Sequence, residues 1–229
     1  MIRRVVGKPA ILCFKLNKMR IRIVSVLSAI IIISIVAFLK MAGAKTETQK
    51  YETLFSEGNF EIRFYPKANL ATVKMSGSYN QNRNSGFQTL AGYIFGGNEE
   101  NKKIAMTSPV RMSNENRNSK MSFILPRSVP FEELPKPSNK NVILHQSEPV
   151  YRASLRFGGY AKSRKIAKKK EEMIQILNKL NLQYKNNFEL LGYNPPFQLL
   201  NRRNEIQVEL KNFNPHNLHE LNETGFNAG

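Results

Sequence analysis

The chain has 229 residues, of which 41% are hydrophobic, and its 13 glycines and 11 prolines are ordinary for a globular protein. This length and composition predict one well-packed domain with an appendage, and they exclude a disordered or collagen-like chain. The formal net charge of +18 is unevenly spread, because eight cations and no acid precede residue 41, so the N-terminal leader carries nearly half of the excess.

The residue types present exclude several classes of catalytic site and metal site. All 17 acidic residues are glutamate, which excludes sites built on the short carboxylate of aspartate, such as EF-hand loops and Asp-containing triads. Cys13 is the only cysteine, so an intramolecular disulfide and a cysteine metal site are excluded too. The sequence also lacks a Gly-rich phosphate loop, a histidine pair at metal spacing and a Gly-x-Ser-x-Gly elbow. It therefore predicts a protein that is not an enzyme.

The N-terminal residues direct the chain to a membrane. Residues 1–22 form a basic leader, and residues 23–39 form a run of 17 residues without charge that Lys40 closes. As a helix this run spans roughly 25 Å, against a hydrocarbon core of about 30 Å. Ala42-Gly43-Ala44 follows and matches the small-x-small pattern of signal peptidase sites. Residues 23–40 are therefore predicted to be either an uncleaved transmembrane anchor or the hydrophobic region of a cleaved signal.

The charge of the leader also predicts an orientation. Positive charge stays on the cytoplasmic side of a membrane, so residues 45–229 are expected outside the cytoplasm, either membrane-anchored or exported. Residues 41–50 are small and polar and predict a linker. An N-terminal hydrophobic helix is thus expected to precede a folded domain over residues 51–210, and an Asn-rich tail over residues 211–229 ends the chain.

The first half of the domain combines strands with one helix. Apolar and charged residues alternate before Pro66, as they do in a half-buried strand that a proline ends. Ser85 can cap a short helix that Gly96-Gly97 ends. The strands predicted in this half are residues 60–65, 70–76, 106–112 and 120–125.

The second half repeats this order, with a strand over residues 150–157, a helix over residues 163–180 and a strand over residues 205–210. Both halves carry a Gly-x-Tyr corner, Gly77-Ser78-Tyr79 and Gly158-Gly159-Tyr160, which indicates an internal duplication. Two such units can close their strands into one barrel without a long exposed edge. We therefore expect an α+β fold, a distorted antiparallel β-barrel of two βαβ-type repeats with two flanking helices, and a cleft between barrel and helix.

Six strings of residues occur along the domain in an order that one known family also shows. They are Tyr51-Glu52 with FEIRFY (residues 60–65), Gly86-Phe87 to Gly97-Asn98 with KIAMTSPV (residues 103–110), Phe123-Ile124-Leu125-Pro126, Phe157-Gly158-Gly159, Tyr193-Asn194-Pro195-Pro196, and Arg202-Arg203-Asn204-Glu205. Over residues 51–210 the chain thus resembles the SOUL haem-binding family. The resemblance implies a barrel of two repeats and non-catalytic binding of haem or another tetrapyrrole.

The first predicted helix and the strand after it supply candidates for the ligand site. A tetrapyrrole needs a mainly apolar slot, and cations near its propionates stabilise it. The candidate cleft residues are Phe87, Leu90, Ala91, Ile94, Met106, Val110 and Tyr160. Residues 85–97 contain no Arg or Lys, which leaves Arg83 as the nearest cation, and His145 is a candidate iron ligand. The apolar candidates are equally suited to an ordinary core.

These observations lead to one expected function and one alternative. Haem is the expected cofactor, held in a hydrophobic cleft for storage, buffering or transport outside the cytoplasm. In the alternative, the barrel binds a different hydrophobic ligand, or a protein partner at the membrane surface. Six cations within residues 162–170 predict either a solvated helix face or attraction to anionic lipid. Nucleic acid is not an expected partner, because the leader exports the domain and no aromatic platform accompanies these cations.

Overall fold

A computed structural model describes residues 32–34, 46–77, 79–115, 118–195, 198 and 200–218 of the chain. Residues 1–45 and 46–229 separate into two units, and the second unit holds the folded domain. Residues 32–34 are helical, whereas the rest of the predicted leader and membrane segment lies outside the described residues. In the part of the chain that the structure describes, no helix is both long and apolar enough to span a membrane.

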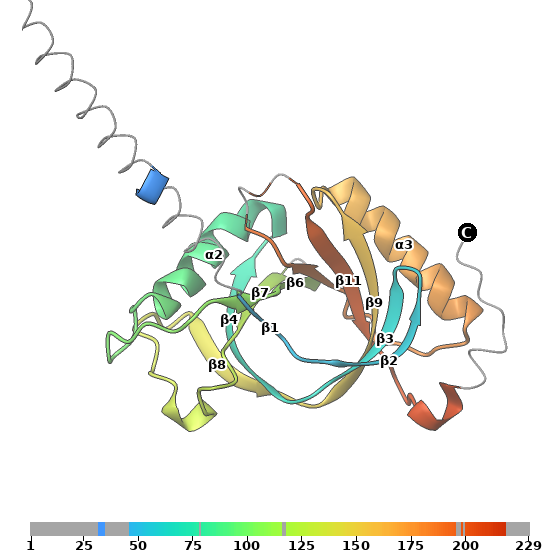
Figure 1. The fold of residues 1–229 in the computed structure, drawn as a ribbon, viewed down its shortest axis with the longest axis horizontal. Helices are drawn as coiled ribbons and strands as arrows, with labels where there is room; N and C mark the ends of the chain where they lie inside the picture. Colours follow the sequence, from blue (N-terminus) through green and yellow to red (C-terminus); the bar gives the residue numbers. More distant parts are fainter. Residues whose placement is uncertain are drawn as a thin grey trace, which may run out of the picture. The chain divides into compact units, whose positions relative to one another are not determined.

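The domain is built on one curved sheet of nine strands, with two helices on its outer face (Figure 1). A second, two-stranded sheet joins β1 (Glu47–Thr48) to β5 (Thr107–Ser108) in parallel. Neighbouring strands of the large sheet are antiparallel. Across the sheet they are β2 (Glu52–Glu57), β3 (Phe60–Tyr65), β9 (Val150–Gly158), β11 (Arg203–Glu209), β10 (Glu189–Gly192), β6 (Val110–Glu115), β7 (Asn118–Ile124), β4 (Ala68–Ser76) and β8 (Val142–Ser147).

The order of the strands reflects an internal duplication. The first half runs β4, α2 (Tyr79–Ile94), β6, β7, and the second runs β9, α3 (Ser163–Lys179), β10, β11. In space the halves are matching triplets, β4-β7-β6 and β9-β11-β10, which meet where β6 pairs with β10. The strand preceding each half pairs with the opposite half, because β3 pairs with β9 and β8 pairs with β4.

The helices cover the outer face of the sheet because their apolar stripes are buried against it. Under α2 the core includes Leu90 together with Phe123 of β7. Under α3 it includes Met173 and Leu177 together with Val208 of β11. Each repeat thus packs its own helix on its own strands.

The inner, concave face of the sheet is polar. Side chains alternate between the two faces of a strand, so Ala71 and Val73 of β4 point into the core under α2, whereas Thr72 and Lys74 point to the concave side. Arg111 of β6 and Glu205 of β11 lie on the same concave side, although both are buried. The cores and the polar side chains are therefore segregated onto opposite faces of one sheet.

This architecture confirms the predicted α+β fold, with its curved antiparallel sheet, two repeats and two flanking helices. In the described residues β2 and β8 are the terminal strands and do not pair with each other, so the barrel is open rather than closed. Helix α2 begins at Tyr79, directly after Gly77 turns the chain at a φ of 99°, and not at Ser85. Residues 47–48, inside the predicted linker, form β1.

Candidate functional site

The candidate residues on the first helix lie in the core. Leu90 and Ile94 are 0% and 1% exposed and pack under α2. Phe87 and Ala91 are partly buried against the same cluster, and the Phe87 ring lies 5.3 Å from the Phe123 ring, edge to face. Val110 is also partly buried there. The structure therefore brings these residues together, but as packed side chains between helix and sheet.

The remaining candidates are scattered. Met106 is 38% exposed and Tyr160 is 47% exposed. The guanidinium of Arg202 lies 4.7 Å from the centre of the Tyr160 ring. Arg83 belongs to α2, and its side chain lies outside the described part of the structure. His145 lies on β8, and its side chain points to the concave side of the sheet.

A cavity of about 430 Å³ opens on the concave face. It lies on the opposite side of the sheet from the cleft that the sequence predicted between barrel and helix. Four cations and one carboxylate line it, together with apolar and uncharged polar side chains. The lining residues are Leu70, Thr72, Lys74, Arg111, Met112, Ser113, Lys120, Ser122, Ile143, His145, Ser147, Arg152 and Glu189.

His145 is held at the wall of this cavity by a short chain of hydroxyl groups. Its Nε2 lies 2.9 Å from Thr72 Oγ1, and that oxygen lies 2.7 Å from Ser122 Oγ. The three residues come from the neighbouring strands β8, β4 and β7. Since one ring nitrogen is engaged by Thr72, the imidazole has a fixed orientation at the wall.

A charged cluster in the same cavity consists of Arg111, Arg152 and Glu189. We call this cluster the arginine pair with its carboxylate. Glu189 Oε2 accepts from Arg111 Nη2 at 2.5 Å, from Arg111 Nε at 3.2 Å and from Arg152 Nη1 at 2.7 Å. Burial opposes ionisation of Glu189, but the two guanidinium charges outweigh it and hold its pKa below the usual value. The carboxylate therefore stays ionised between two buried cations.

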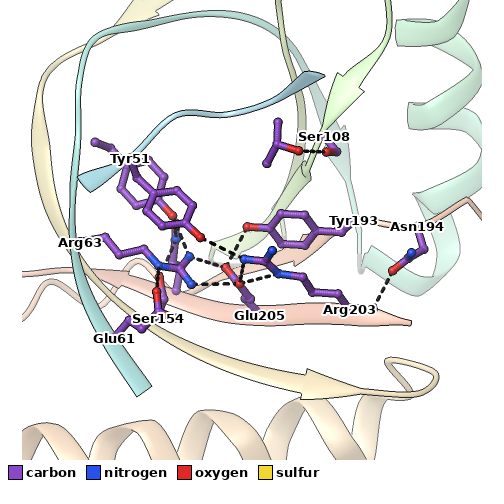
Figure 2. A network of polar contacts seen from close by, with 12 residues as sticks. Tyr51, Glu61, Arg63, Ser108, Ser154, Tyr193, Asn194, Arg203 and Glu205 are labelled. Carbon is purple, nitrogen blue, oxygen red and sulfur yellow. Dashed lines mark hydrogen bonds and ion pairs between the residues drawn. The ribbon is translucent and has the colours of Figure 1, made fainter. Parts of the chain in front are cut away.

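A second charged network lies on the concave face near β3 and β11, and Figure 2 shows its side chains converging on Glu205. Glu205 is 0% exposed. It accepts from Arg63 at 2.7 and 3.1 Å and from Arg203 at 2.6 and 3.0 Å. The Tyr193 hydroxyl donates to it at 2.9 Å. Burial opposes ionisation of Glu205, but these arginines outweigh it and hold its pKa below the usual value.

The outer members of this network balance its charge. Arg63 Nε also donates to Glu61 at 2.6 Å, so that two arginines meet two glutamates. The Tyr51 ring lies 4.1 Å from the Arg63 guanidinium, which stacks on it. Because its charges are matched internally, this network needs no ligand.

The segment that contains the cavity and both charged clusters matches a known family. A sequence model described as "SOUL heme-binding protein" matches residues 46–209. The chain belongs to the SOUL family. This confirms the resemblance seen in the sequence and supports the predicted binding of haem or another tetrapyrrole.

Individual SOUL relatives agree with this assignment. "Heme-binding protein 2" of Mus musculus is 31% identical over 176 residues, which cover 68% of this chain and 80% of the relative. "Heme-binding protein 2" of Homo sapiens is 28% identical over 173 residues, with the same coverage. "Heme-binding protein 1" of Xenopus laevis is 25% identical over 154 residues, which cover 64% of this chain and 81% of the relative.

Solved structures share the SOUL fold at low sequence identity. The C-terminal domain of EcmrR superposes with a TM-score of 0.51 at 9% identity, covering 71% of this chain and 99% of that domain. A hydrolase from Listeria innocua superposes with a TM-score of 0.50 at 12% identity, covering 75% of this chain and 96% of that one. These likenesses concern the fold alone.

Apart from His145, sequence reasoning missed the residues that line the cavity of this SOUL domain. The signal was present, because Thr72 and Lys74 on β4 and Lys120 and Ser122 on β7 are alternate polar residues. In an isolated strand such residues indicate a solvated face. Only the curvature of the sheet gathers them into a cavity.

Proposed function

We propose that this protein binds haem or another tetrapyrrole without catalysing a reaction, and that the ligand occupies the cavity on the concave face. The observation that carries the proposal is the cavity itself, with a volume of about 430 Å³ and cations, apolar side chains and an imidazole on its wall. Ligand pockets commonly measure roughly 300 to 1,000 Å³. The slot beside α2 is the alternative site, and its residues are those predicted from the sequence.

The wall of the cavity suits an anionic ligand with an apolar body. Leu70 and Ile143 supply apolar surface, and Ile143 is 44% exposed. Lys74 and Lys120 supply ammonium groups that would hold propionates by charge-assisted hydrogen bonds. A purely apolar ligand would desolvate the cations of this wall without offsetting their charge, which is unfavourable.

His145 would hold the iron of a haem in this cavity. Imidazole is a common iron ligand, and because Thr72 engages Nε2, Nδ1 would be the nitrogen offered to the iron. Haem would supply an iron centre and a strong visible absorption band, and the protein would supply orientation and protection from water. Among the described residues, no group of three or more histidine, cysteine or acidic side chains is placed to bind a metal ion alone.

The proposed setting of this activity is outside the cytoplasm, where the protein would store, buffer or transport its ligand. The basic leader and the uncharged run over residues 23–39 support it. Protease added to sealed vesicles or intact cells should then digest the domain while a cytoplasmic marker stays intact. Protection of the domain along with the marker would contradict this location.

A hemin titration of the purified full chain in detergent tests the function. We expect a saturable one-to-one shift of the Soret band, with protoporphyrin IX titrated in parallel to show how much of the affinity depends on iron. Absence of saturation with either compound would contradict tetrapyrrole binding. It would favour the alternative, a different hydrophobic ligand or a protein partner at the membrane surface.

A further inference from the structure

The cavity on the concave face holds more positive than negative charge. Glu189 is its only acidic lining residue among the described ones, whereas Lys74, Lys120, Arg111 and Arg152 are cationic. Arg111 and Arg152 are 7% exposed each. Buried cations in excess of their partners are costly unless an anion joins them.

The arginine pair with its carboxylate is short of one acceptor. All three hydrogen bonds that join it end on one atom, Glu189 Oε2. Arg152 Nε is buried without a hydrogen-bond partner. Burial lowers the pKa of Arg152 below its usual value. The attraction of Glu189 opposes this shift, and the repulsion of Arg111 adds to it. One carboxylate therefore does not satisfy all the hydrogen-bond donors of the two guanidinium groups.

Two lysines on neighbouring strands add to the positive charge of the cavity. Lys74 of β4 lies directly opposite Lys120 of β7 in the register of the sheet, and both line the cavity. Like charges placed opposite each other across two strands destabilise a sheet. A negatively charged ligand in the cavity would lower the repulsion between these like charges.

The network around Glu205 provides the internal contrast. It also has two arginines on one buried carboxylate, but Glu61 supplies a second acid. That network is balanced, and none of these residues lines the cavity. The imbalance is therefore a property of the cavity and not of the concave face in general.

We propose that Arg111 and Arg152, together with Lys74 and Lys120, form a subsite for a carboxylate group of the ligand. A planar carboxylate suits guanidinium donors, which can bind it through two parallel hydrogen bonds. The identity of that ligand as a tetrapyrrole rests on the proposed function, in which the group would be a propionate. The subsite itself rests only on the charges and contacts of the cavity.

Thermal unfolding of the full chain and of Glu189→Gln tests the subsite without a porphyrin. The substitution removes the charge of the Glu189 carboxylate, which competes with a bound carboxylate for the two guanidinium groups. Succinate, compared with chloride at equal ionic strength, should therefore raise the unfolding midpoint of Glu189→Gln more than that of the wild type. Glu205→Gln is the matched control, since it also strips a carboxylate from two buried arginines but outside the cavity, and succinate should give it no more than the wild-type increase.

A pair of porphyrins then separates the subsite from the proposed function. The wild type should bind mesoporphyrin IX about ten-fold more tightly than its dimethyl ester, which cannot accept charge-assisted bonds. Equal affinities together with no effect of succinate would overturn the subsite while leaving tetrapyrrole binding intact. If neither porphyrin binds but succinate stabilises Glu189→Gln selectively, the subsite holds for another carboxylate and the tetrapyrrole function fails.

Discussion

Glu205 and Glu189 each accept hydrogen bonds from two arginines, yet their surroundings differ. Glu205 is fully buried and receives five hydrogen bonds from Arg63, Arg203 and Tyr193. Glu189 is 20% exposed and faces the cavity. The first carboxylate therefore contributes mainly to stability, because its removal leaves buried cations unpaired. The second is placed where a ligand can reach its partners.

Replacing Glu205 with glutamine should lower the free energy of unfolding by about 3 kcal/mol, because two buried guanidinium groups lose their counter-charge. Urea denaturation followed by circular dichroism measures this change. Glu132→Gln in the exposed turn of residues 131–133 is the control, and it should stay within about 0.5 kcal/mol of the wild type. An equally small effect at Glu205 would contradict the role given to the network.

Acid should destabilise the fold through the same carboxylates. The folded pKa values of Glu189 and Glu205 lie below the ordinary 4.5, so the unfolded chain binds more protons than the folded one just below that pH. The free energy of unfolding should therefore be at its full value above pH 4.5 and fall as the pH drops through the folded pKa values. Urea midpoints across this range should fall less steeply in Glu205→Gln than in the wild type, and equal slopes would contradict the assignment.

The helices and strands show which secondary structure can be predicted from sequence patterns and which cannot. Apolar spacing at 3.6 residues predicted α3 to within one residue at its end, because its face is buried on a sheet. Three strands of the large sheet, β2, β8 and β10, were not predicted. β10 has only four residues, too few for a period. Met106 and Leu90 were placed in one slot because strand and helix periodicity say which face is apolar, but not whether that face is packed or open.

Two of the glycines in helix α2 and the turn after it have opposite roles. A Cβ at Gly92 would meet no atom within 4 Å, whereas one at Gly97 would lie 2.7 Å from the backbone oxygen of Gly92. Gly92→Ala should therefore stabilise the fold by about 0.5 to 1 kcal/mol, since alanine favours a helix. Gly97→Ala should destabilise it, because the backbone contact must open. Urea denaturation of both variants checks this, and the same sign for the two changes would contradict the packing described for this turn.

The molecule as a whole joins two repeats so that their helices lie outside one curved sheet and their polar strand faces lie inside it. Sequence motifs predicted this duplication and the SOUL family. They did not predict that Arg111 of the first repeat and Arg152 of the second would meet at Glu189, because that contact depends on the pairing of β6 with β10 and of β11 with β9. Residues far apart in sequence come together only through this strand order.

The central claim is that a tetrapyrrole binds on the concave face of the sheet. Two exposed apolar residues allow a matched test, Ile143 at the cavity and Met106 among the residues predicted for the slot beside α2. Hemin titrations should show that Ile143→Glu weakens binding about ten-fold or more, because the new carboxylate repels the propionates, while Met106→Glu binds as the wild type does. Loss of hemin binding in Met106→Glu, with Ile143→Glu unaffected, would contradict the claim.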